Sequence, residues 1–214
     1  MESSIIDFDD MGLKETILQG IYAFGFENPS PIQQKAILPG ASGKDLKIHA
    51  QSGTGKTGAF CIGALNRIEN TSNTEILIIS PTRDLAIQTG KVIRNLSAYM
   101  DVRVHESIGG TSARDDGDAL RTKPNIISGT PGRINDQIKR SNLDTSLIKV
   151  LIIDEVDEML SQGFVDDMKS IVQSLIKGTQ IIVASATYRA ETHTICDELL
   201  QNPVKIEIKQ EDIT

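Results

Sequence analysis

The sequence has little cysteine, and its two cysteines, Cys61 and Cys196, stand far apart with no histidine at metal-ligand spacing. This pattern argues against a disulfide framework and against a cysteine–histidine zinc site. It favours two reduced, mostly buried thiols and a reducing, intracellular compartment. The chain also lacks any run of about 18 consecutive apolar residues, so no transmembrane helix is predicted. Internal repeats and low-complexity tracts are absent, which argues against a repeat architecture.

An excess of basic residues is also missing. With 22 Lys and Arg against 29 Asp and Glu, the formal net charge is −7, and this acidic balance argues against a polyelectrolyte binder. Any contact with nucleic acid would have to be local, through backbone amides, helix N-termini and a few arginines. The acidic N-terminal stretch MESSIIDFDD has neither the basic start nor the apolar run of a secretory signal. We expect a cytoplasmic protein, with a nuclear location as the alternative.

Short apolar runs rich in Ile and Val alternate with amphipathic stretches of helix length. The length of 214 residues suits one domain, or two small ones, and 39% hydrophobic residues suffice for a core. The alternation is typical of βαβ units, and it predicts an open doubly wound α/β domain with a mainly parallel sheet and helices on both faces. Strands are expected at 76–80, 102–108, 125–128, 150–154, 180–185 and 204–208, and helices around 13–24, 32–38, 57–69, 83–99, 131–140, 165–176 and 189–201.

Two local patterns refine this arrangement. Ser30 is expected to cap the helix at 32–38, with Pro31 at its first position. The segment 45–50 should be a central strand, yet Lys47 and His49 interrupt it. We expect both side chains on a less buried face, with the lysine ammonium reaching water, in preference to a catalytic His49.

The stretch HAQSGTGKT, residues 49–57, ends like a phosphate-binding loop, although Ala50 stands where that pattern usually begins with glycine. Gly53 and Gly55 let the chain curl so that successive N–H groups face phosphate oxygens at a helix start. Lys56 would neutralise the β- and γ-phosphates, and Thr57 would offer its hydroxyl to Mg²⁺. A glycine-rich turn without a ligand is the alternative. The strand pattern before the loop and the helix pattern after it favour the nucleotide site.

A second acidic site follows the apolar run 150–153. Asp154 would hold Mg²⁺ through its waters, and Glu155 would orient the attacking water as general base. That division of labour favours hydrolysis over transfer to a small molecule. The alternative is an acidic helix N-terminus, which the helix dipole favours by itself.

Seven short motifs follow one another along the chain: GFENPSPIQ (25–33), AQSGTGKT (50–57), PTRDLA (81–86), GG (109–110), TPGR (130–133), DEVD (154–157) and SAT (185–187). In this order they resemble the motifs of the first RecA-like domain of DEAD-box RNA helicases, which are P-loop NTPases. The resemblance covers nearly the whole chain and is greatest to the translation initiation factor 4A group. Helicases of this superfamily commonly begin the phosphate loop with alanine.

The resemblance implies an ATP or ADP site with Mg²⁺. Gln33 would read the adenine edge, since an amide matches adenine N6 and N7 together, and the upstream Phe8 would pack on the base. Without the motif, Gln33 would be an ordinary surface glutamine. The catalytic residues implied are Lys56, Asp154 and Glu155. The remaining phosphate contacts would come from Ser52, Gly53, Thr54, Gly55, Lys56 and Thr57.

The resemblance also implies an RNA path that follows the sugar-phosphate backbone without reading sequence. PTRD and TPGR can equally be strand-to-helix turns, and both interpretations are compatible. Ser185 and Thr187, with Asp157 as their partner, would link the γ-phosphate site to domain closure, unless they form a plain Ser/Thr turn. The residues expected along the RNA are Pro81, Thr82, Arg83, Gly109, Gly110, Thr130, Gly132 and Arg133.

Three departures from the family pattern are present. Val156 replaces alanine and should pack inward without disturbing the acids. Asp84 replaces a glutamate that should brace the RNA-facing turn. Lys47 and His49 interrupt the strand before the phosphate loop.

The arginine-rich motifs expected of a second helicase domain are not found in these 214 residues. We expect residues 1–24 to form an N-terminal segment with the first helix, 25–208 to form the first RecA-like domain, and 209–214 to begin an interdomain linker. The resemblance implies a partner role for a second RecA-like domain and for a translation-initiation scaffold protein. It implies no membrane.

The function implied is that of an RNA-dependent ATPase that opens short RNA duplexes in translation initiation, nearly inactive as this domain alone. The alternative is an ATP-gated RNA clamp or assembly scaffold in splicing or ribosome assembly. A small-molecule P-loop kinase is disfavoured, because no lid-like arginine segment is present and Glu155 stands beside Asp154.

Overall fold

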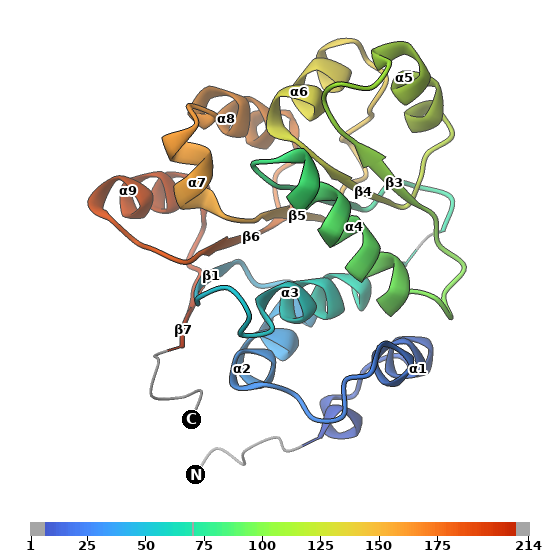
Figure 1. The fold of residues 1–214 in the computed structure, drawn as a ribbon, viewed down its shortest axis with the longest axis vertical. Helices are drawn as coiled ribbons and strands as arrows, with labels where there is room; N and C mark the ends of the chain where they lie inside the picture. The colour runs from blue at the N-terminus through green and yellow to red at the C-terminus, as the bar shows by residue number, and fades with distance from the viewer. Residues whose placement is uncertain (1–6, 70, 209–214) are drawn as a thin grey trace.

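The computed structural model describes residues 7–69 and 71–208. Within these ranges seven strands form one sheet in the order β3-β4-β2-β5-β6-β1-β7, and every neighbouring pair is parallel (Figure 1). The expected α/β sheet is confirmed, and its described part is parallel throughout. The strands are β1 (Leu46–His49), β2 (Ile76–Ile79), β3 (Val104–Ser107), β4 (Ile126–Gly129), β5 (Val150–Ile153), β6 (Gln180–Ser185) and β7 (Val204–Glu207).

Runs of isoleucine, leucine and valine make the central strands. Every residue of β2, β4, β5 and β6 is buried, as expected for parallel strands covered on both faces. Alternate side chains still point to opposite faces. Ile76 and Ile78 lie in one hydrophobic cluster, whereas Leu77 and Ile79 lie in the other. The sheet is therefore the middle layer between two apolar cores.

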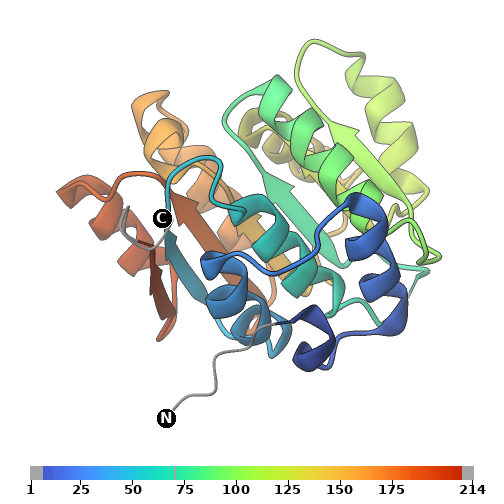
Figure 2. The ribbon, with the colours of Figure 1, turned by 60° about the horizontal axis from the view of Figure 1, so that its bottom comes forward.

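Helices cover both faces of the sheet (Figures 1 and 2). The core that contains Ile76 takes buried residues from η1 (Phe8–Met11), α1 (Glu15–Phe24), α2 (Pro31–Ala41), α3 (Lys56–Leu65) and α4 (Arg83–Leu96). The core that contains Leu77 takes them from α5 (Ala113–Arg121), α6 (Pro131–Lys139), α7 (Val156–Ser161), α8 (Val165–Ser174) and α9 (Ala190–Leu199).

The N-terminal elements share the first of these cores. Phe8, Ile17 and Ile21 are fully buried in the cluster that also holds α3 and α4. Helix α1 approaches α4 so closely that a Cβ on Gly20 would collide with the carbonyl oxygen of Leu96. Figure 2 shows η1, α1 and α2 on the same side of the sheet as α3 and α4. Within the described ranges, no helix is long and apolar enough to cross a membrane.

All seven expected helices are present, with ends displaced by a few residues, and Ser30 and Pro31 begin α2 as predicted. Helices α5 and α7 were not predicted. Helix α5, ARDDGDALR, has few apolar residues and a glycine, and α7 is only six residues long. The expected linker, 209–214, lies outside the described residues.

Candidate functional site

The loop between β1 and α3 has the backbone of a phosphate-binding turn. Gly53 and Gly55 have φ values of +83° and +91°, which glycine adopts without strain. Gly55 is the N-cap of α3, so the first N–H groups of that helix have no intrahelical partner. A helix start behind a glycine turn suits phosphate oxygens. The six residues 52–57, expected at the phosphates, thus form one continuous turn and helix start.

Lys56 connects this turn to the acidic pair at the end of β5. Its Nζ atom lies 2.9 Å from Glu155 Oε1 and 3.8 Å from Asp154 Oδ1, and its side chain is 5% exposed. Burial raises the pKa of Asp154 to about 6, against the opposing effect of the Lys56 charge. The three residues expected to be catalytic are therefore brought together. The buried ammonium partly compensates two carboxylates that would otherwise repel each other.

The backbone of Glu155 is strained. Its φ of 51° and ψ of 53° lie in the left-handed region, which costs a non-glycine residue about 1–3 kcal/mol. The turn lets the Glu155 N–H donate to Asp154 Oδ1 at 3.0 Å while the Glu155 carboxylate reaches Lys56. Val156, the next residue, is fully buried. It packs inward as expected, and so anchors the turn.

Two oxygen donors fit a Mg²⁺ ion that arrives with a nucleotide. Thr57 lies in the first turn of α3, and Asp154 follows β5. Hydroxyl and carboxylate oxygens, completed by water and phosphates, are the ligands that Mg²⁺ prefers. In the described ranges, no group of three His, Cys, Asp or Glu side chains could hold a metal. A nucleotide-bound Mg²⁺ needs no such cage.

The SAT residues form a closed network with Asp157. The Oδ2 atom of Asp157 accepts hydrogen bonds from Thr187 Oγ1 at 2.7 Å and from its N–H at 3.1 Å. The Asp157 N–H donates to Ser185 Oγ at 3.3 Å, and Ser185 Oγ donates to the Thr187 carbonyl at 2.8 Å. Burial by itself would raise the pKa of Asp157, but the hydrogen bonds from Thr187 and Ser185 outweigh it and hold this pKa below its usual value. The predicted partnership of these three residues is present.

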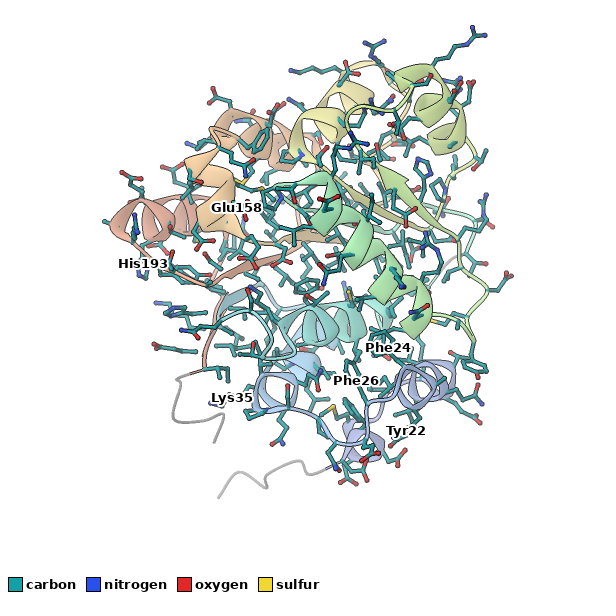
Figure 3. The ribbon with its side chains drawn as sticks, viewed as in Figure 1. Tyr22, Phe24, Phe26, Lys35, Glu158 and His193 are labelled. Carbon is teal, nitrogen blue, oxygen red and sulfur yellow. The ribbon has the colours of Figure 1, made fainter. Side chains whose placement is uncertain are left out.

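A cavity of about 420 Å³ opens beside this network. Its lining includes Glu155, Asp157, Glu158 and Thr187, together with Arg189. Glu158 is labelled in Figure 3 on α7, above the sheet. With Glu191, the lining has four carboxylates against the single arginine, so the cavity suits a cationic partner.

Gln33 ties α2 to the phosphate loop. It is 2% exposed, its Oε1 atom accepts from the Ser30 N–H at 2.8 Å, and its Nε2 atom lies 3.5 Å from the Gly55 carbonyl. The Ser30 hydroxyl donates to the Thr54 carbonyl at 2.9 Å. Gln33 is thus next to the loop but is not a surface residue.

The expectation that Phe8 packs on an adenine base is wrong for this structure. Phe8 is fully buried, so it has no surface to offer a base. Phe26, which the sequence argument passed over, is only half-buried and stacks on Phe8 with ring centroids 6.4 Å apart. A Cβ on Gly58 would lie 3.0 Å from both Phe26 and Gln33. Figure 3 labels Phe26 beside Phe24. The position of Phe26 inside GFENPSPIQ was the signal that could have identified it.

The turns expected to face RNA lie side by side at the carboxyl ends of β3, β4 and β2. Thr82 caps α4, and its Oγ1 atom accepts from the Leu85 N–H at 3.3 Å. Thr130 begins α6, and its Oγ1 atom accepts from the Gly109 N–H at 3.4 Å. Because parallel strands end at one edge of a sheet, Pro81, Thr82, Gly109, Gly110, Thr130 and Gly132 are gathered there, as the expected path requires.

Arg83 and Asp84 both lie near this edge, but only Arg83 contacts one of the RNA-facing turns. Arg83 is exposed, and its guanidinium lies against Gly110. Asp84 is exposed in the first turn of α4 and has no hydrogen bond or ion pair from its side chain to any other described residue. The bracing role expected of a carboxylate at this position is therefore not filled by Asp84.

Arg133 does not offer its charge to a phosphate, contrary to expectation. Its Nη1 atom donates to Asp116 Oδ2 at 3.1 Å and to Thr111 Oγ1 at 3.0 Å, and its Nη2 atom donates to the Thr111 carbonyl at 2.7 Å. The side chain is 9% exposed. Arg133 braces the loop after β3 from within, because a carboxylate and a carbonyl meet both prongs of its guanidinium.

Lys47 also differs from its predicted environment. The predicted solvent exposure of its ammonium is wrong, because α9 covers this face of β1 and the side chain is 7% exposed. Its Nζ atom lies 3.1 Å from Asp197 Oδ1 and 3.1 Å from His193 Nδ1, and His193 is labelled on α9 in Figure 3. His49 is 41% exposed, as expected, and its Nε2 atom lies 3.2 Å from the carbonyl oxygen of Ala186 in the SAT turn.

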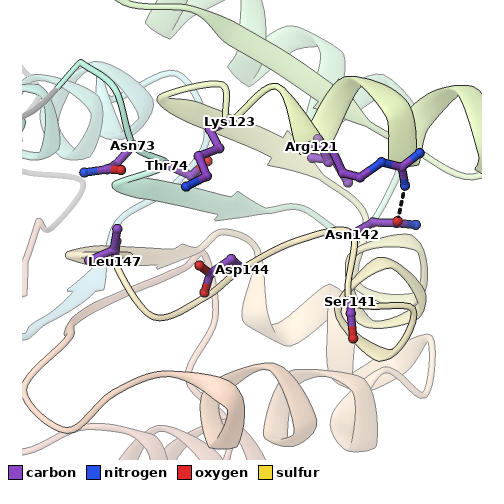
Figure 4. A pocket seen from close by; sticks show the side chains of 9 residues that line it. Asn73, Thr74, Arg121, Lys123, Ser141, Asn142, Asp144 and Leu147 are labelled. Atoms are coloured by element: carbon purple, nitrogen blue, oxygen red, sulfur yellow. Dashed lines mark hydrogen bonds between the residues drawn. The ribbon is translucent and has the colours of Figure 1, made fainter.

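A further cavity lies at the opposite edge of the sheet (Figure 4). It measures about 170 Å³ and is lined by Thr74, Arg121, Lys123, Asn142 and Leu147 among others. Thr74, Lys123 and Leu147 precede β2, β4 and β5 respectively. Ligands of parallel α/β sheets bind at the carboxyl ends of strands, so this cavity is not the candidate site.

The geometry agrees with a match to a family model. Residues 30–195 match the model of the DEAD/DEAH box helicases. The chain belongs to the DEAD/DEAH box helicase family. The matched range contains the residues of the candidate nucleotide and RNA sites except Phe8 and Phe26, which precede it.

Relatives of this helicase domain include translation factors. It is 48% identical over 208 residues to the ATP-dependent RNA helicase eIF4A of Eremothecium gossypii. The aligned residues make up 97% of this chain and 52% of that relative. This domain is 45% identical to the eukaryotic initiation factor 4A of Caenorhabditis elegans, over the same shares. The chain thus spans about half the length of these curated relatives.

Solved structures confirm the RecA-like fold of the DEAD-box proteins. A DEAD box protein from Methanococcus jannaschii superposes with a TM-score of 0.91 at 33% identity, covering 95% of this chain and 56% of that one. The Saccharomyces cerevisiae protein Dbp5 L327V, solved bound to RNA and ADP BeF3, superposes with a TM-score of 0.87 at 29% identity, covering 97% of this chain and 53% of that one.

Proposed function

We propose that this chain is the ATP- and RNA-binding part of an RNA helicase that hydrolyses ATP and acts in translation initiation in the cytoplasm. The observation that carries this proposal is the buried cluster of Lys56, Asp154 and Glu155 beside a glycine turn. It is supported by the relatives named ATP-dependent RNA helicase eIF4A.

The Lys56–Glu155 ion pair suggests how binding prepares the reaction. Incoming β- and γ-phosphates compete for the Lys56 ammonium, and its departure frees the Glu155 carboxylate. Glu155 then accepts a proton from the water that attacks the γ-phosphorus, while the bond to the β-phosphate oxygen breaks. Mg²⁺, held by Thr57 and Asp154 through its waters, would neutralise charge on the phosphates. Gln33 and Phe26 would face the adenine.

The proposed RNA contacts are made at the turns on the carboxyl edge of β2, β4 and β3. Backbone amides at the starts of α4 and α6, the Gly109–Gly110 turn and the exposed Arg83 supply donors for phosphates. Such contacts need no broad basic face, which agrees with the net charge of −7. The acidic cavity beside Asp157 and Thr187 would receive cationic groups of a second RecA-like domain, and a scaffold protein of translation initiation is a further proposed partner.

Calorimetry with ADP and GDP in the presence of Mg²⁺ tests the nucleotide site. The unmodified chain should prefer ADP. Gln33→Ala should reduce that preference at a cost of about 1–3 kcal/mol, whereas Gln34→Ala, whose amide bonds to the Pro29 carbonyl, serves as the matched control. Equal affinities for ADP and GDP in the unmodified chain would overturn the adenine site.

The same titration separates the roles of the charged residues. Lys56→Ala should lose most of the ADP affinity, and Glu155→Gln should keep it within about twofold, because only the lysine neutralises phosphate. If both variants bind ADP equally well, this division of labour is wrong.

A further inference from the structure

We propose that Asp116, on α5, is a positioning residue that holds the RNA-facing turns in place, an inference that rests on the proposed function. No sequence motif pointed to it. Its place in the fold, between the last residues of β3 and the first turns of α6, suggests the role.

The Asp116 carboxylate is a buried hub. The residue is 6% exposed, and its Oδ1 atom accepts a hydrogen bond from His105 Nε2 at 2.7 Å. Its Oδ2 atom accepts from Ser107 Oγ at 2.8 Å, from Gln137 Nε2 at 3.0 Å and from Arg133 Nη1 at 3.1 Å. Two donors come from β3 and two from α6. One carboxylate therefore joins three elements.

The network continues into the loop that carries Gly109 and Gly110. Arg133, fixed by Asp116, donates to the side chain and the carbonyl of Thr111. The Thr111 hydroxyl in turn donates to the Ile108 carbonyl at 2.9 Å. The glycine turn is thus held from its far end by Arg133, and the direction of its amides depends on the Asp116 hub.

Loss of the charge would disturb all four donors. Burial by itself would raise the pKa of Asp116, but the hydrogen bonds from His105, Ser107 and Arg133 outweigh it and lower this pKa. The carboxylate therefore stays ionised. An asparagine would turn its NH₂ group either toward the three donors at Oδ2 or toward His105 Nε2, which can accept only in its other tautomer, and it would lose the charge that pairs with Arg133. A buried donor without an acceptor is costly, and the adjacent turns would shift.

The contacts of Asp116 predict a selective effect. None of its hydrogen bonds reaches Lys56, Asp154 or Glu155. RNA affinity should therefore fall while nucleotide affinity stays the same, and a general loss of structure would lower both.

The test compares Asp116→Asn with Asp118→Asn, an exposed aspartate of the same helix that pairs with Arg121. Fluorescence anisotropy with a short labelled oligo-uridine RNA at low salt measures RNA affinity, and calorimetry measures ADP affinity. Hydrogen exchange over residues 108–113 and 130–134 reports on the turns. Asp116→Asn should lose about tenfold in RNA affinity and exchange faster in both segments, with ADP affinity unchanged. Asp118→Asn should match the unmodified chain in all three.

A second variant covers the case in which Asp116→Asn does not fold. Arg133→Lys keeps a cation but cannot bond Asp116 and Thr111 together, so it should reproduce the faster exchange of 108–113 and the loss of RNA affinity. Equal exchange and equal RNA affinity in Asp116→Asn and Asp118→Asn would overturn the proposal, as would Arg133→Lys behaving like the unmodified chain. If the unmodified chain binds no RNA, the proposed RNA function fails, and hydrogen exchange alone decides whether Asp116 orders the turns.

Discussion

At the scale of single residues, the site is built at a cost to stability. Asp154 is 4% exposed and its carboxylate is disfavoured by burial, while Glu155 holds a left-handed backbone. Such features persist where the surrounding structure enforces them, here through the buried Val156 and the Lys56 ammonium. The buried Asp154 and the left-handed Glu155 each bring a carboxylate to Lys56 of the proposed phosphate-binding loop.

Asp154→Asn should stabilise the chain without Mg²⁺ by about 1–3 kcal/mol near pH 8. The pKa of Asp154 is raised from 3.8 to about 6, so the folded state binds the proton more tightly than the unfolded chain. Stability of the unmodified chain should therefore rise as the pH falls through 6 toward 4. The advantage of the asparagine should shrink over the same range. Urea unfolding at several pH values measures this, with Asp118→Asn as the exposed control. A variant less stable than the unmodified chain near pH 8 would show that Lys56 needs the charge more than burial opposes it.

Phe8 and Phe26 should separate into a core residue and a base-contact residue. Phe8→Ala should cost about 3–5 kcal/mol of stability, because the ring is fully buried. Phe26→Ala should cost less stability but lower ADP affinity roughly tenfold, since stacking on a base contributes about 1–3 kcal/mol. Urea unfolding and calorimetry with ADP measure the two effects. An unchanged ADP affinity in Phe26→Ala would remove Phe26 from the proposed adenine site.

At the scale of elements, one helix pair depends on the absence of a side chain. Gly20→Ala should destabilise the chain by about 1–3 kcal/mol, because its Cβ would collide with the Leu96 carbonyl oxygen where α1 crosses α4. This exceeds the gain in helix propensity of about 1 kcal/mol. Gly132→Ala, in the first turn of α6, is the control, since its Cβ would have only Asp167 Oδ2 nearby, at 3.9 Å. Urea unfolding of both variants checks the difference. Equal stability of the two would show that α1 can move away from α4 at little cost.

Strand ends and helix starts make the site as a set. Because the seven strands of the described residues are all parallel, the phosphate loop after β1, the acids after β5, the SAT turn after β6 and the turns after β2, β3 and β4 share one edge. The proposed nucleotide and RNA positions are therefore neighbours along this edge although they are far apart in the sequence.

At the scale of the whole molecule, residues 1–214 alone should show almost no RNA-stimulated ATPase activity. Arg133 is buried on Asp116, and Arg83 lies against Gly110, so neither is directed to a γ-phosphate. An arginine finger contributes on the order of 10³–10⁵ in rate in comparable NTPases. Phosphate release with saturating RNA measures the activity, and addition of a second RecA-like domain as a separate chain should raise it. Rapid turnover by residues 1–214 alone would mean that an arginine of this chain completes the site, and Arg189, which lines the cavity beside Glu155, would be the first to replace.

The sequence by itself determined the parallel α/β fold and most of the site. The apolar runs at 76–80 and 150–154 and the loop GTGKT depend on local chemistry, namely burial on both faces, glycine conformations and helix starts. Since the elements follow from short patterns, and parallel strands must end together, Lys56, Asp154 and Thr82 could be assigned to one edge before their contacts were known.

Only the tertiary structure decided what each side chain contacts. Phe8 was expected on a base but lies in the core, Lys47 was expected in water but meets α9, and Arg133 was expected on RNA but binds Asp116. In each case the deciding partner comes from an element distant in the chain or not predicted, such as α5. Burial and hydrogen bonding depend on which elements pack together, and this packing is not encoded in any single local motif.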